Sequence, residues 1–96
     1  MTSKQRSKLM SLAQDLTPVL SIGKSALTPE VTESVSEAFN TRELIKINIL
    51  QNCLEDRMTM AQALADRTHS QLVQVIGRKI VLYKQAKDPK DRKIEL

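Results

Sequence analysis

The chain has 96 residues, of which 41% are hydrophobic, and its formal net charge at pH 7 is +4. This length allows one small domain and leaves no room for a second. The basic balance favours a polyanionic partner, and the single cysteine excludes a disulfide within the chain.

The first part of the chain predicts a helix, a short strand and a second helix. Apolar residues recur with helical spacing over residues 3–15, and Pro18 is expected to end this helix. Residues 19–22 predict a strand. Thr28 and Pro29 suit the cap and the first position of a helix over residues 29–40.

The rest of the chain predicts a strand, a helix and a hairpin. Residues 44–49 alternate strictly, which places Lys46 and Asn48 on a face that should meet solvent. A third helix is expected to start near Thr59, whose spacing to Gln62 matches a capping box. Two β-rich runs, 72–76 and 80–83, flank a reversal at residues 77–79 and predict a hairpin.

This order of elements, helix-strand-helix-strand-helix-strand-strand, predicts an α/β fold. We expect a compact two-layer domain with a four-stranded mixed sheet over residues 1–86. Residues 87–96 are charged and almost without apolar side chains, so a mobile tail is expected there.

Charge is distributed unevenly along the chain. Residues 1–24 carry a net charge of +3, residues 25–70 carry −3 and residues 71–96 carry +4. If the two ends meet in the fold, the molecule has a positive face and a negative face.

Residues 22–29 combine a glycine turn, a cation and a helix start, an arrangement suited to a phosphate group. We expect Gly23 to take a positive φ so that backbone N–H groups converge, beside the positive end of the next helix. Lys24 adds a full charge. The alternative is an ordinary strand-to-helix turn, and the turn taken alone favours this alternative.

Several segments, taken in order, resemble the YhbY type of CRM domain, the chloroplast RNA splicing and ribosome maturation module. They cover nearly the whole chain and comprise residues 22–24, 27–29, 42–46, 73–78, 81–83 and 91–94. The resemblance implies a stand-alone bacterial RNA-binding protein that acts in maturation of the large ribosomal subunit. It also implies a fold related to the C-terminal domain of translation initiation factor three.

The family's loop has the form Gly-x-x-Gly and resembles the loop by which KH domains hold nucleotide backbones. Ala26 stands at the second glycine position here, where a positive φ would cost about 1 kcal/mol or more. The predicted RNA-binding residues are Gly23, Lys24, Ser25, Ala26, Arg42, Lys46, Arg78 and Lys79. For each of the cations in this set, a solvated surface charge is the alternative interpretation.

The expected partner is RNA, specifically precursor large-subunit ribosomal RNA, bound by a cytoplasmic monomer that contacts no membrane. Phe39 and Tyr83 are the only aromatic residues, so recognition should depend on backbone charge and RNA shape. The alternative function is a protein-interaction adaptor in ribosome assembly that makes no RNA contact.

Catalysis is not expected. Cys53 and His69 are the only thiol and the only imidazole, and no pattern places them within reach of each other. One cysteine and one histidine also fall short of the four ligands of a structural zinc site. We therefore predict no catalytic residues, no metal and no cofactor.

Overall fold

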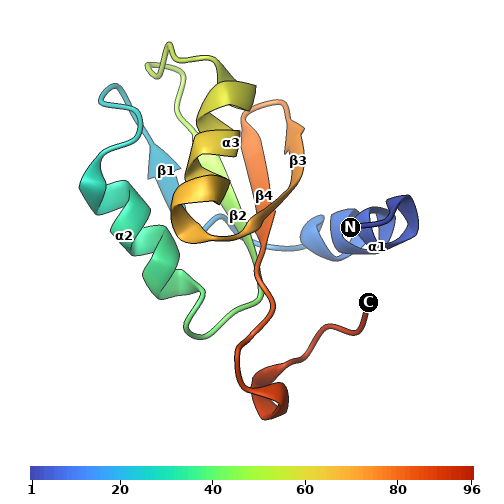
Figure 1. The fold of residues 1–96 in the computed structure, drawn as a ribbon. Helices are drawn as coiled ribbons and strands as arrows, with labels where there is room; N and C mark the ends of the chain where they lie inside the picture. Colours follow the sequence, from blue (N-terminus) through green and yellow to red (C-terminus); the bar gives the residue numbers. More distant parts are fainter.

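The structure is a computed structural model that describes residues 1–96, with helices packed on both faces of one sheet (Figure 1). Its elements are, in chain order, α1 (Ser3–Ala13), β1 (Leu20–Ile22), α2 (Pro29–Ala38), β2 (Leu44–Ile49), α3 (Arg57–Thr68), β3 (Gln71–Ile76), β4 (Lys79–Tyr83) and the 3₁₀ helix η1 (Pro89–Asp91). The strand order is β1-β2-β4-β3, with β1 parallel to β2 and the other two pairs antiparallel. The predicted α/β fold with a four-stranded mixed sheet is confirmed.

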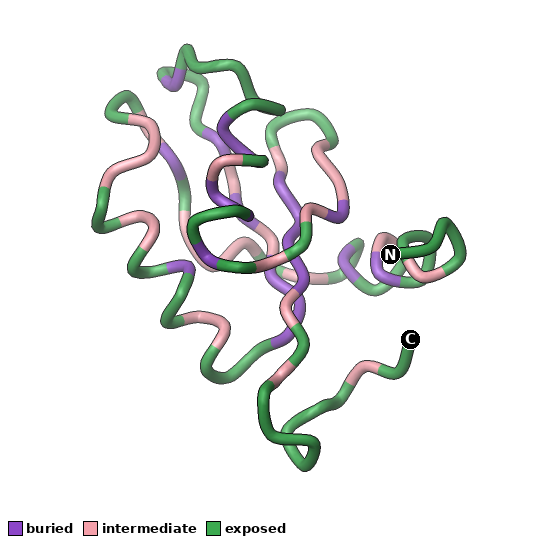
Figure 2. The backbone as a smooth tube through the Cα atoms, viewed as in Figure 1, coloured by how far each residue is buried: buried purple, intermediate pink, exposed green.

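The main core lies between the sheet and the pair of helices α2 and α3. Ile45, Ile47 and Ile49 of β2 all point into it and are at most 1% exposed, as the alternation predicted. Val35 of α2 and Leu64 of α3 cover them. Figure 2 shows this buried stripe running along the central strands.

α1 packs on the opposite face of the sheet. Leu9 is fully buried there, in a second cluster with Val81 and Tyr83. Lys46 is half-buried, with its ammonium 3.4 Å from the Gln14 carbonyl at the end of α1, and Asn48 is half-buried between the side chains of Ser21 and Lys79, so neither is open to solvent as expected. The alternation of β2 predicted which side chains share a face, but a helix distant in sequence decides how much of that face meets water.

Capping side chains set the starts of α2 and α3. Thr28 Oγ1 accepts the Val31 N–H at 3.2 Å, as predicted for the cap of α2. The predicted start of the third helix near Thr59 is wrong, because Asp56 is the cap. Its carboxylate accepts the backbone N–H of Thr59 at 2.8 Å and the Thr59 hydroxyl at 2.7 Å, and Gln62 bonds Asp66 instead of a cap.

Glu43 ties the C-terminal segment to the start of β2. Its carboxylate accepts the backbone N–H groups of Ala86 at 2.9 Å, Lys93 at 2.7 Å and Ile94 at 3.1 Å. Burial by itself raises the pKa of Glu43, but these three donors and the charge of Arg92 together hold it below its ordinary value. That residues 87–96 form a mobile tail stays a prediction. The three hydrogen bonds to Glu43 would have to break before this segment could move away from β2.

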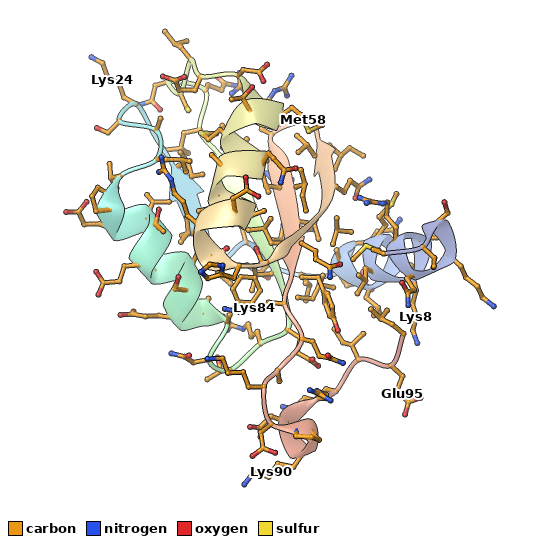
Figure 3. All side chains as sticks on the ribbon, viewed as in Figure 1. Lys8, Lys24, Met58, Lys84, Lys90 and Glu95 are labelled. Atoms are coloured by element: carbon orange, nitrogen blue, oxygen red, sulfur yellow. The ribbon has the colours of Figure 1, made fainter.

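The two basic ends of the sequence meet in the fold, which is the condition on which the hypothesis of a positive face depends. The Lys8 ammonium donates to the Glu95 carbonyl, and Ile94 packs against the cluster that contains Leu9. The last residues therefore lie beside α1 (Figures 1 and 3).

Candidate nucleic-acid interface

Three loops meet at one end of the sheet, and we call this surface the loop end. It comprises residues 23–26 after β1, residues 50–56 after β2 and residues 77–78 between β3 and β4. Ile22 lies opposite Ile49 in the parallel pair, so the first two loops leave the sheet side by side. The sheet register therefore assembles segments that are more than 50 residues apart in sequence.

Two arginines brace the loop end. The Arg78 guanidinium donates to the Leu50 carbonyl at 3.1 Å. The Arg57 guanidinium donates to the Gly77 carbonyl, which links the start of α3 to the hairpin turn. Both arginines are exposed, so they hold the loops together through some N–H groups and keep others for a ligand, since each guanidinium has five.

In the turn after β1, the left-handed backbone conformation lies at a different residue from the one expected. The Gly23 carbonyl accepts the Ala26 N–H at 3.0 Å, which closes a tight turn with Lys24 and Ser25 at its centre. The predicted positive φ of Gly23 is wrong, because the left-handed residue is Ala26, with φ +55°. Ala26 keeps the backbone geometry for which glycine is the usual residue.

Backbone donors in this turn remain available to a ligand. The N–H groups of Lys24, Ser25 and Leu27 donate to no group of the protein, whereas that of Ala26 is used inside the turn. The Lys24 ammonium forms no ion pair and projects into solvent from the tip of the loop (Figure 3). Exposed amides beside a cation suit a phosphate oxygen.

Carboxylates limit the direction from which an anion approaches. A shallow recess lies between residues 25–27 and the start of α3, and Glu55 and Asp56 both line it. Hydrogen bonds from the backbone and the hydroxyl of Thr59 lower the pKa of Asp56, so it is negative at neutral pH. An anion is therefore favoured on the side of Lys24 and the two arginines, away from this recess.

The structure distributes the eight predicted residues over three places. The loop end brings together Gly23, Lys24, Ser25, Ala26 and Arg78. Lys46 and Lys79 lie on the sheet face that α1 partly covers, where Lys79 donates to the Asn48 side chain and Lys46 lies 3.4 Å from the Gln14 carbonyl.

Arg42 is not part of the loop end. It precedes β2, whereas the loop end follows that strand, so about 25 Å of extended chain separates Arg42 from Leu50. Arg57 is a loop-end cation that the sequence analysis did not select. Its position in the sequence could have indicated it, because Arg57 starts the helix that follows the second strand. The loop before that helix lies beside the loop that follows the first strand.

The groups considered for catalysis lie far apart. Cys53 is buried before α3, with its Sγ 3.9 Å from the sulfur of Met60. His69 caps the other end of the same helix with φ +55°, and the helix rises about 14 Å over the nine residues from Met60 to His69. The structure contains no group of three or more potential metal-ligating side chains, and none of its helices has the length and apolar character needed to span a bilayer.

Comparisons with known proteins agree on one family. A family model described as the CRS1/YhbY (CRM) domain matches residues 1–84. A Bacillus subtilis protein named probable RNA-binding protein YqeI is 46% identical over 96 residues, which is 100% of this chain and 98% of that protein. A Haemophilus influenzae protein named RNA-binding protein is 32% identical over 90 residues, covering 94% of this chain and 91% of that one.

A solved structure shows the same fold. A Staphylococcus aureus protein, solved in solution and described as a candidate RNA-binding protein, superposes with a TM-score of 0.82. It is 37% identical in sequence, and the match covers 99% of both chains. The likeness therefore extends over the whole fold, including the C-terminal segment that the family model does not reach.

Proposed function

The chain belongs to the CRS1/YhbY (CRM) domain family, and from this premise we propose that it binds RNA through the loop end. The observation that carries the proposal is the turn at residues 23–26. Its outer N–H groups lack protein partners, and the neighbouring Lys24 is unpaired. The names of two relatives, which describe RNA binding, support the same ligand.

The binding mode follows from the groups present. The N–H groups of Lys24 and Ser25 would donate to one phosphate, with the Lys24 ammonium neutralising its charge. The guanidinium groups of Arg57 and Arg78 would contact phosphates further along the same backbone, toward the hairpin turn. Contacts of this kind set the position of the RNA and its affinity, and they read little sequence.

The finer role is an expectation from the family resemblance. We propose that the RNA is precursor large-subunit ribosomal RNA, that the protein acts as a cytoplasmic monomer, and that it aids subunit maturation by occupying or stabilising a region of that RNA. No reaction is part of this role. The separation of Cys53 from His69 along α3 supports a binding function over a nucleophilic one.

A salt titration tests the role of the loop end. Fluorescence anisotropy with a structured ribosomal RNA fragment would be measured at several salt concentrations for the wild type and for the double variant Lys24→Gln/Arg78→Gln. For each phosphate that the protein no longer neutralises, the slope of log affinity against log salt should fall by about 0.7–0.9. We therefore expect the slope of the double variant to be smaller by about 1.4–1.8.

The matched control is Arg67→Gln, which removes an exposed cation from α3. It should leave the slope close to that of the wild type. If the control, which removes one cation instead of two, lowered the slope by about half as much as the double variant, net charge alone would explain binding and the loop end would not be the site. A wild type that bound no RNA at all would overturn the function itself.

One observation favours the adaptor function as a second candidate. Leu54 is 93% exposed and Met58 is 56% exposed, and both lie at or next to the loop end. Exposed apolar side chains of this size are suited to contact with another protein. Isolation of the chain from cells before and after nuclease treatment separates the two functions, because an adaptor keeps its ribosomal protein partner without RNA.

A further inference from the structure

The sheet face that carries α1 is only half covered, and its uncovered half adjoins the loop end. α1 packs over Leu44, Val81 and Tyr83 of β2 and β4. One row of side chains nearer the loops stays outside this contact: Ser21 of β1, Asn48 of β2, Lys79 of β4 and Ile76 of β3, which the sheet register places side by side. We call this set the open row.

Hydrogen bonds join the open row into a continuous polar surface. Asn48 Nδ2 donates to Ser21 Oγ at 3.3 Å, and the Lys79 ammonium donates to Asn48 Oδ1. Ile76 ends the row and is 58% exposed. With neighbouring strands about 4.8 Å apart, the row spans about 14 Å across the sheet.

These bonds leave hydrogen-bonding capacity for a ligand. The second N–H of the Asn48 amide, the proton of the Ser21 hydroxyl and two protons of the Lys79 ammonium have no partner in the protein. Amide and hydroxyl groups of this kind bond the edges of nucleobases. The exposed Ile76 side chain adds an apolar surface against which a base or ribose can pack.

The charge around the open row fits a polyanion. The cations of α1 and the four strands are Lys4, Arg6, Lys8, Lys46 and Lys79, and the same elements contain no aspartate or glutamate. By contrast, α2 on the other face carries three glutamates and no cation. The side of the sheet that bears the open row is therefore the positive face of the molecule.

We propose that the open row binds unpaired nucleotides of the RNA whose backbone the loop end holds. This inference rests on the proposed function and names the form of RNA at that site. The row lies flat in the sheet and does not project, so it cannot reach base edges in the deep, narrow major groove of an RNA duplex, and the shallow minor groove is recognised mostly by its shape, 2′-hydroxyls and phosphates. Unpaired bases can turn their edges toward it. Without an aromatic side chain, recognition would depend on hydrogen bonds instead of stacking.

Two RNAs of equal length test the proposal, one without secondary structure and one that forms a closed hairpin. The variant Ser21→Ala/Asn48→Val/Ile76→Ala changes no charge and introduces no hydrogen-bonding side chain. Removing two hydrogen bonds should weaken binding of the unpaired RNA by about fivefold or more. Binding of the hairpin should change by less than about twofold, and the salt slope should stay that of the wild type, because the variant neutralises the same phosphates.

The wild-type chain provides a measurement that does not depend on how the variant folds. Backbone amide signals of the four open-row residues in an NMR titration should move with the unpaired RNA and much less with the hairpin. Movement confined to the loop end with both RNAs would overturn the proposal while leaving the proposed function intact. If the triple variant bound both RNAs more weakly by the same factor, the proposal would be overturned as well. The open row could then serve to contact another protein.

Discussion

Replacing Ala26 by glycine should stabilise the protein, although glycine usually weakens a fold. Ala26 has φ +55°, where an L side chain meets the neighbouring backbone at a cost of about 1–2 kcal/mol. Glycine removes this strain, but its extra freedom in the unfolded chain costs about 0.5–1 kcal/mol. The difference lies between zero and about 1.5 kcal/mol, so the free energy of unfolding should rise by about 0.75 kcal/mol, and Tm by about 3–6 °C for a domain of this size.

Gly23→Ala should also be tolerated. This result would show that the loop does not need glycine at the first position of the Gly-x-x-Gly pattern. Gly23 does not have a left-handed backbone. A Cβ atom there would lie 3.5 Å from Leu50 Cδ1 and 3.7 Å from Asn52 Oδ1, which are ordinary contact distances. Because alanine restricts the unfolded chain, we expect a change between zero and a gain of about 1 kcal/mol.

Gly77→Ala provides the matched control. Gly77 has the same φ of +55°, and nothing lies within 4 Å of a Cβ built there. Its substitution therefore isolates the cost of the left-handed backbone, and a loss of about 0.5–1 kcal/mol is expected. Urea unfolding followed by circular dichroism would give all three values. Lower stability of Ala26→Gly, or a loss above about 1 kcal/mol for Gly23→Ala, would refute the assignment of strain to position 26.

Further predictions concern the tail, the third helix and the docking of α1. Because Glu43 has a lowered pKa, its contribution to stability is complete above its ordinary value of 4.5 and is lost as the pH falls through the lowered value. In Glu43→Gln this acid-dependent loss should disappear, with faster hydrogen exchange of the Lys93 and Ile94 amides; unchanged exchange would show that the tail is held by other contacts. Asp56→Ala should cost about 1 kcal/mol in urea unfolding by removing the cap of α3, and no change would mean that water replaces the cap. Leu9→Ala should cost about 2–5 kcal/mol, whereas a loss below about 1 kcal/mol would show that α1 packs only loosely.

Features that depend on neighbouring residues were predictable from the sequence. The alternation at residues 44–49 is a local consequence of strand geometry, and the Thr28-Pro29 pair suits the start of a helix by itself. The third helix shows the limit of local cues, because Asp56 and Thr59 are both residues that cap helices. Only the structure shows that the Thr59 hydroxyl donates to Asp56 instead of accepting a backbone N–H.

Features that depend on distant segments were not predictable. The sequence gives no sign that Glu43 holds the C-terminal segment, because its three donors lie 43 to 51 residues away. The face on which α1 packs was equally undetermined, since an amphipathic pattern shows that a helix has an apolar side without identifying its partner. Arg57 joined the candidate site for the same reason, through a hairpin turn 20 residues further along the chain.

The placement of α1 also decides what the positive face can bind. If α1 covered the whole sheet face, apolar packing between α1 and the sheet would occupy that face. The cations could then contact a ligand only around the edge of the packed area. Because α1 leaves the Asn48 and Lys79 positions outside the cluster around Leu9, the uncharged hydrogen-bonding groups of Ser21 and Asn48 lie next to the Lys79 cation, on the sheet face that also carries Lys46 and α1. Charge alone attracts any polyanion and weakens uniformly with salt. The uncharged groups are the part of this surface that can distinguish one form of RNA from another, so discrimination that persists at high salt is the property to expect of it.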